Sequence, residues 1–280
     1  SAEIAAIRGT VYVEYQTLAK ALCSLLGTLR MDTDNIIEAF DPEVTKRDTR
    51  FALHMPGMGM VIFDRTSKEL LWTDEKDLVP ALRERLVQGQ TEPCAEFPVW
   101  ATHSISGNKG VLVFGTGPAL DSIAKTRCKA VLRSMRFPLN QYIWINEIRN
   151  YQGGPGYAVR AVHMGMPESE GMELSTDTRD RAGNLPYKEE LEGIVAHGKT
   201  FFTYFFTRPD SDEAGEKLAY AQLYKPFDWV ICTGIYTSDM QAIVEKRKSD
   251  FMRVFDEQVT SLARIIFIMA LLYAVLMVFF

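Results

Sequence analysis

The chain has 280 residues, of which 47% are hydrophobic and 11% aromatic, so it can bury a substantial core. This composition excludes the collagenous, low-complexity and intrinsically disordered classes of protein. The 31 basic and 36 acidic residues give a formal net charge of −5 without a basic block, and we therefore expect no nucleic-acid partner. The length suits one large domain or two small ones.

The first 50 residues are expected to form a long helix and a connector. Apolar residues recur at steps of three and four, which is typical of an amphipathic helix; they are Ile4, Ile7, Val11, Tyr15, Leu18, Leu22, Leu25 and Leu29. Such a seam also suits packing against a partner helix. We therefore expect a homodimer.

Residues 51–120 are predicted to form a small α/β module. Two strands over 59–64 and 69–72 precede a helix over 78–86, and a hairpin follows with strands at 103–106 and 111–115. The order of strand pair, helix and strand pair is typical of a small PAS-like sheet.

Residues 121–240 repeat this pattern at a larger scale. A helix over 121–136, with Asp121 as its N-cap, opens the segment. A second helix is predicted over 188–197, and five strands are predicted over 142–147, 157–163, 200–206, 217–224 and 229–236. The predicted fold class is thus α+β, with a long N-terminal helix and two mostly antiparallel PAS-like modules.

The C-terminal segment, residues 241–280, is predicted to be an exit helix that continues into a membrane. Residues 265–280 read IIFIMALLYAVLMVFF and carry no charged side chain. A full membrane span needs about 20 apolar residues, so we expect a transmembrane helix of which the sequence holds only a part. The alternative is a C-terminal hairpin of buried helix. No Gly or Pro interrupts the chain after Ser238.

The second module carries the residue types that a small-molecule pocket needs, which are aromatic walls with a few placed polar groups. Period-2 alternation puts Trp144 and Asn146 on one face of their strand. It also puts Tyr157 and His163 on one face of the next strand, with Arg160 on the other face unless the strand is bulged. The full candidate set is Trp144, Asn146, Tyr157, His163, Tyr204, Lys217, Tyr220 and Tyr236.

A cation, tyrosine hydroxyls and aromatic rings together suit a small carboxylate. Each candidate also has a structural alternative: Trp144 as a core residue, His163 as a satisfied core histidine, and Lys217 as one partner of a solvated ion pair. The chain has no G-x-S-x-G elbow, no H-E-x-x-H motif, no phosphate-binding glycine loop and no CxxC pair. We therefore expect neither enzymatic activity nor a metal or cofactor.

Three strings in the second module occur in an order found in a known sensor family. They are YIWIN (142–146), K-x-x-Y (217–220) and DWV-x-x-TG-x-Y (228–236). This region resembles the Cache domain, the extracytoplasmic PAS-like sensor of bacterial transmembrane receptors. It is most similar to the Cache sensors that are joined to diguanylate cyclases and histidine kinases. The Arg-x-Trp-Tyr signature of the amino-acid-binding version is missing.

The resemblance implies a double-Cache arrangement, with a membrane-distal module over 51–120 and a membrane-proximal one over 121–240. It implies a receptor in the cell inner membrane, with residues 1 to about 260 extracytoplasmic. A small molecule, with an organic acid favoured, would shift the exit helix by a piston or a rotation. The output domain outside this chain would be a diguanylate cyclase, a histidine kinase or a chemotaxis module. The alternatives are a dimerising structural ectodomain and a module that binds a partner protein.

Overall fold

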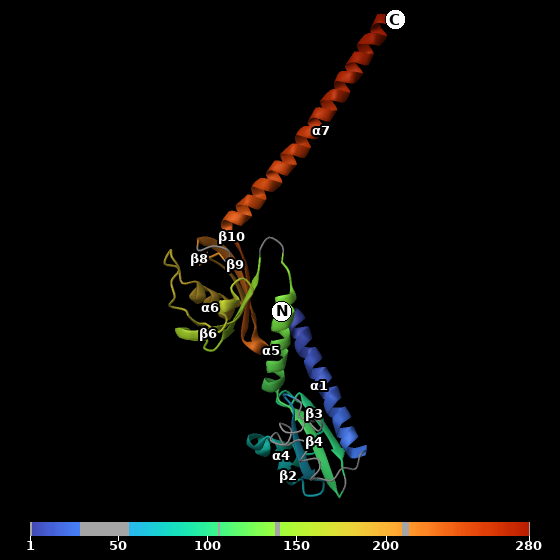
Figure 1. The fold of residues 1–280 in the computed structure, drawn as a ribbon, viewed down its shortest axis with the longest axis vertical. Coiled ribbons are helices and arrows are strands. Elements are labelled where there is room, and N and C mark those ends of the chain that lie inside the picture. Colours follow the sequence, from blue (N-terminus) through green and yellow to red (C-terminus); the bar gives the residue numbers. More distant parts are fainter. Residues whose placement is uncertain (1, 29–55, 106, 138–140, 209–212, 280) are drawn as a thin grey trace. The chain divides into compact units, whose positions relative to one another are not determined.

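The computed structural model describes residues 2–28, 56–105, 107–137, 141–208 and 213–279, with side chains up to residue 274. The chain divides into two compact units, Ser1–Met135 and Arg136–Phe280 (Figure 1). The fold is α+β with antiparallel sheets, an N-terminal helix and a C-terminal apolar helix, as predicted. The connector predicted before residue 50 lies outside the described residues.

The N-terminal helix α1 spans Ala2–Thr28 and packs along the first sheet. The predicted apolar seam is right at Val11 and Leu22, which are buried, and wrong at Leu18 and Leu25, which are 45% and 49% exposed. The buried face is rotated by about one residue from the predicted seam, and it includes Ala19, Cys23 and Leu26.

The first unit holds a four-stranded sheet in the order β2-β1-β4-β3. Its strands are β1 (Gly59–Asp64), β2 (Leu70–Thr73), β3 (Val99–Ser104) and β4 (Lys109–Gly115), and a short helix, α4 (Val79–Val87), follows β2. The strand predicted over 103–106 begins earlier, because Val99, Trp100 and Ala101 are buried while the polar residues after them lie at its exposed end. Leu82 and Leu86 of α4 pack on one face of this sheet.

Helix α5 (Gly117–Ser134) also belongs to the first unit. It starts before the predicted Asp121 cap, because the side chain of Thr116 accepts a hydrogen bond from the backbone N–H of Ala119 and caps the helix there. Asp121 instead accepts bonds from Arg8 (2.6 Å) and Tyr12 (2.7 Å) of α1. The predicted capping role of Asp121 is therefore wrong, and the residue ties two helices together.

The second unit holds a six-stranded antiparallel sheet in the order β7-β6-β5-β10-β9-β8. Its strands are β5 (Ile143–Ile148), β6 (Pro155–His163), β7 (Glu173–Ser175), β8 (Lys199–Thr207), β9 (Ala214–Tyr224) and β10 (Trp229–Tyr236). The five predicted strands are present, and β7 is the additional one. It is only three residues long, and its central Leu174 is buried in the core.

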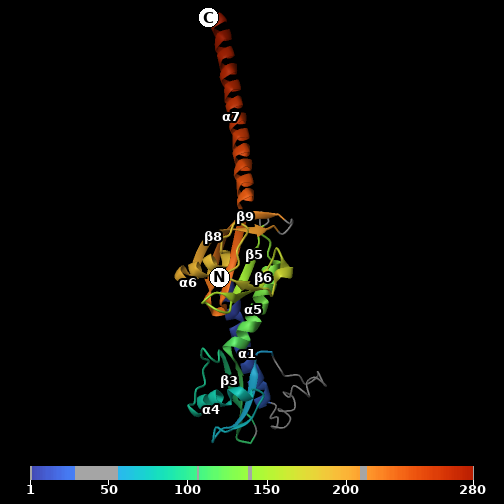
Figure 2. The ribbon, with the colours of Figure 1, turned by 90° about the vertical axis from the view of Figure 1, so that its left-hand side faces the viewer.

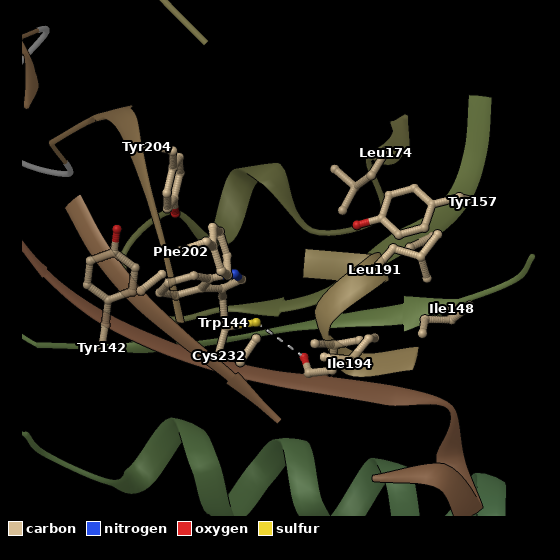
Figure 3. Close-up of a cluster of buried hydrophobic side chains, with 14 residues drawn as sticks. Tyr142, Trp144, Ile148, Tyr157, Leu174, Leu191, Ile194, Phe202, Tyr204 and Cys232 are labelled. Carbon is tan, nitrogen blue, oxygen red and sulfur yellow. Dashed lines mark hydrogen bonds between the residues drawn. The ribbon is translucent and has the colours of Figure 1, made fainter. Parts of the chain in front are cut away.

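Helix α6 (Pro186–His197) packs against one face of this sheet, and the main core of the second unit lies between them. Figure 3 shows this core, with Tyr142 and Tyr204 on the left, Tyr157 on the right, and Trp144 and Cys232 between them. Because side chains alternate along a strand, the residues of β9 and β10 that face this core are every second one.

Helix α7 (Thr237–Phe279) begins one residue after β10 ends and runs without interruption (Figure 2). It contains one stretch that is long and apolar enough to cross a membrane. From Ile265 to Tyr273 its large apolar side chains are more than half exposed, so the alternative of a buried C-terminal helix is not what the structure shows.

Candidate functional site

The side chain of Lys217 is enclosed by aromatic rings on the α6 side of the second sheet. It is only 1% exposed, and its Nζ donates a hydrogen bond to the Tyr142 hydroxyl at 2.7 Å. The same nitrogen lies 4.0 Å and 4.1 Å from the ring centroids of Tyr142 and Trp144, and the rings of Phe206 and Tyr236 are 5.6 Å and 5.4 Å away. Such rings attract a cation through their negative faces.

Burial changes the acid–base behaviour of this lysine. Desolvation, with a smaller contribution from the positive charge of Arg160, lowers the pKa of Lys217 to about 7. Among the residues that the structure describes, no carboxylate oxygen lies within 4.0 Å of the Lys217 ammonium. The buried ammonium therefore contacts aromatic rings and the Tyr142 hydroxyl, and it has no anionic partner among the described residues.

Arg160 provides a second buried cation beside the same rings. The buried polar residues of this region and the rings around them are called the buried cluster below; the polar residues are Lys217, Arg160, His163, Glu190 and Asn146. Its side chain bonds the Tyr187 hydroxyl and lies 5.9 Å from the centroid of the Phe206 ring, which Lys217 also approaches. The sequence placed Arg160 on the opposite face from His163. The register between β5 and β6 shifts so that Val162 and Arg160 pair with consecutive residues of β5, and this bulge brings Arg160 to the inner face.

His163 lies among these rings and cations. Its ring centroid is 5.0 Å from that of Tyr142 and 5.9 Å from that of Phe206. Desolvation lowers the pKa of His163 to about 3, and the charges of Arg160 and Lys217 act in the same direction. The imidazole is therefore neutral at physiological pH and adds a polar atom without adding charge.

Glu190 of α6 is the carboxylate of the cluster. It falls on the buried stripe of α6 together with Pro186 and Ile194, one helical turn from each. Its oxygens accept hydrogen bonds from the Asn146 amide, at 3.0 Å and 3.2 Å, and from the Tyr157 hydroxyl at 3.1 Å. The Cys232 thiol donates a further bond at 3.3 Å. Desolvation raises the pKa of Glu190, whereas these donors stabilise its ionised form.

Three polar atoms of the cluster are buried and have no hydrogen-bond partner in the part of the chain that the structure describes: Asn146 Oδ1, Arg160 Nε and His163 Nδ1. All three side chains are at least nine-tenths buried. Buried polar groups in proteins are nearly always paired, because an unpaired one costs about 1–3 kcal/mol. Their concentration in one cluster leaves it with hydrogen-bonding capacity that the described residues do not use.

Seven of the eight predicted residues lie on this inner side of the sheet. The exception is Tyr220, which lies on the opposite face of β9 from Lys217 and packs against the exposed Phe201, with ring centroids 4.8 Å apart. The two positions are three residues apart in a regular strand, so they face opposite ways. Tyr204 lies near the rings around Lys217, and its ring centroid is 5.7 Å from that of Phe206.

The sequence analysis did not place Glu190 in the site, and it placed Arg160 on the wrong face. The signal for Glu190 was present, because it occupies an inward position between apolar residues, while the neighbouring Glu189 is exposed. The signal for Arg160 depends on a bulge, which alternating positions alone do not reveal.

The family model described as Cache domain matches residues 112–241. The methyl-accepting chemotaxis protein McpP of Pseudomonas putida KT2440 is 26% identical over 153 residues, which cover 53% of this chain and 26% of that relative. The chain therefore spans about a quarter of that relative's length.

Solved structures of chemotaxis proteins also match. A periplasmic sensor domain of a chemotaxis protein is 25% identical, covers 41% of this chain and 74% of its own, and has a TM-score of 0.37. A methyl-accepting chemotaxis protein from Vibrio parahaemolyticus is 27% identical, covers 42% and 74%, and has a TM-score of 0.35. The region that carries the buried cluster falls within the matched residues 112–241, and this region is an extracytoplasmic Cache sensor domain.

Proposed function

We propose that the chain is the ligand-binding region of a bacterial transmembrane receptor and that the buried cluster binds a small organic acid. The observation that carries this proposal is the pair of buried cations, Lys217 and Arg160, neither of which has a carboxylate within 4.0 Å in the described part of the chain. A buried charge is costly unless it is paired. A carboxylate between the two cations would remove that cost.

Charge and chemistry favour a monocarboxylate. With Glu190 ionised, the cluster holds two cations and one anion, so one further negative charge balances it. Three aromatic rings surround the Lys217 ammonium, those of Tyr142, Trp144 and Phe206. They exclude water, and this strengthens charge-assisted hydrogen bonds to a carboxylate. The same rings suit the short apolar tail of a small acid.

The rest of the proposal follows the Cache assignment. The first unit would be the membrane-distal module of a double-Cache arrangement, and the receptor would be a homodimer in the inner membrane with residues 1 to about 260 outside the cytoplasm. Ligand binding would move α7, which passes the change to a cytoplasmic output domain such as a chemotaxis module, a histidine kinase or a diguanylate cyclase. The chain itself would be non-catalytic.

Calorimetric titration of the full chain in lipid nanodiscs tests the proposal, with propionate as the acid and propionamide as its uncharged counterpart. We expect propionate to bind and propionamide not to bind. Lys217→Met should weaken propionate binding by about 1.5–3 kcal/mol, the worth of a charged hydrogen bond. Lys199→Met, which removes an exposed lysine of β8, is the matched control. Unchanged affinity in Lys217→Met would remove the cluster as the site, and a failure of all small acids to bind would favour the structural or protein-binding alternatives.

A further inference from the structure

The side-chain amide of Asn146 is held in one orientation by Glu190. Its Nδ2 donates to both carboxylate oxygens of Glu190. With Glu190 ionised, its carboxylate only accepts hydrogen bonds, so the amide cannot turn its oxygen toward Glu190 without losing both bonds. The other end of the amide, Oδ1, is therefore directed away from Glu190, and it is buried with no partner among the described residues.

Glu190 is itself held by side chains from two further strands. The Tyr157 hydroxyl of β6 and the Cys232 thiol of β10 each donate to one of its oxygens. These contacts hold the carboxylate of Glu190 in place. The carboxylate in turn holds Nδ2 of Asn146 toward itself, so that Oδ1 points away from it. The site therefore presents a hydrogen-bond acceptor at Asn146 Oδ1.

The residue paired with Asn146 in the sheet supplies a hydrogen-bond donor. Asn146 and Arg160 are direct partners across β5 and β6, and Arg160 Nε is also buried without a partner. Side chains of such cross-strand partners start about 4.5–5.5 Å apart. A ligand whose carboxylate accepts from Arg160 thus needs a hydrogen-bond donor close to that carboxylate in order to satisfy Asn146 Oδ1.

We propose that this site selects 2-hydroxy acids over unsubstituted and 2-oxo acids, and that Glu190 sets the selectivity as a positioning residue through Asn146. The inference rests on the proposed function. A 2-hydroxyl donates to Asn146 Oδ1, an unsubstituted acid leaves that oxygen unpaired, and a 2-oxo group places a second acceptor opposite it. A 2-amino group would bring an ammonium beside two cations, Arg160 and Lys217, which disfavours it.

The first test compares four three-carbon acids by calorimetric titration of the full chain in nanodiscs: propionate, 2-hydroxypropionate, 2-oxopropionate and alanine. We expect the hydroxy acid to bind about ten- to a hundredfold more tightly than the other three. Equal affinities, or tighter binding of propionate, the oxo acid or alanine, would overturn the selectivity while leaving an anion site in place. If none of the acids binds, the proposed function fails as well.

The second test uses Glu190→Gln, because a glutamine side chain supplies a donor where the carboxylate supplies none. Asn146 can then turn its Oδ1 toward residue 190 and present Nδ2 to the ligand. We expect the preference to reverse, so that the oxo acid binds more tightly than the hydroxy acid. Glu189→Gln, an exposed neighbour on the same helix, should keep the wild-type order.

A purely structural role for Glu190 would weaken all acids equally without changing their order, and that result would overturn its assignment. Circular dichroism shows whether Glu190→Gln folds. If it does not fold, Asn146→Ala is the second variant, because it removes the acceptor and should bring the affinities of propionate and the hydroxy acid together. Retained discrimination in Asn146→Ala would also overturn the proposal.

Discussion

Lys217 and Tyr236 are direct partners across strands β9 and β10, and the Lys217 ammonium lies 5.4 Å from the centroid of the Tyr236 ring. The next residue after Tyr236 begins α7. The guanidinium of Arg208 lies 4.2 Å from the same ring and bonds Asp239 in the first turn of α7 at 2.9 Å. One aromatic ring thus contacts both the buried lysine and the arginine that holds the start of the exit helix.

Arg208→Lys tests this connection. Lysine cannot make the paired contacts to Asp239 and Ser238 or stack on Tyr236 as a planar guanidinium does. We expect backbone amides 240–244 to exchange with solvent about two- to tenfold faster, because an exposed ion pair and a cation–π contact are lost. The affinity for a small acid should stay within about twofold, because Arg208 does not touch Lys217.

Hydrogen exchange with mass spectrometry measures the exchange rates of amides 240–244, and calorimetry measures the affinity for the acid. Arg253→Lys, which changes an exposed arginine further along α7, is the control and should alter neither quantity. Unchanged exchange in Arg208→Lys would show that this contact does not hold the start of the helix.

The affinity for a carboxylate should fall as the pH rises above neutrality. Burial lowers the pKa of Lys217 to about 7, and only its protonated form attracts an anion. Binding is therefore strongest below pH 7 and should weaken by up to about tenfold per pH unit above it. His163, whose pKa burial lowers to about 3, does not titrate in this range.

Calorimetric titrations between pH 6 and pH 9 measure this dependence. In buffers of different ionisation enthalpy, binding at pH 8 should also show uptake of a proton, since the anion raises the pKa of Lys217. The control is Lys217→Arg, which keeps the charge and should flatten the profile. A flat profile in the wild-type chain would mean that Lys217 is not the anion partner.

The sequence predicted most helices and strands because their apolar residues follow simple periods. The strands from Trp229 to Tyr236 and from Gly59 to Asp64 match their predicted bounds, since both are mostly apolar runs that turn residues enclose. The aromatic walls of the cluster also followed from alternation along single strands. These features depend only on residues close together in the chain.

The remaining parts of the site depend on contacts between distant residues. Arg160 reaches the cluster through a bulge against β5, and Glu190 is buried because Asn146, Tyr157 and Cys232 provide its donors. The bulge has no local signature, and for Glu190 the one local signal is its inward position on α6. The same reason explains the error at Asp121, whose partners Arg8 and Tyr12 are more than 100 residues away.

Thr116→Ala tests the corrected N-cap of α5. Loss of the bond from the Ala119 N–H should lower the free energy of unfolding of the first unit by about 1 kcal/mol. Native-state hydrogen exchange of the buried amides of β4, which lies in the same unit, measures this change. Thr126→Ala, which removes a hydroxyl bonded to the Ser122 carbonyl within the same helix, is the control and should have a smaller effect. If the two variants behave alike, the Thr116 side chain does not stabilise the helix start, and the early start of α5 rests on its buried residues Gly117 and Leu120 instead.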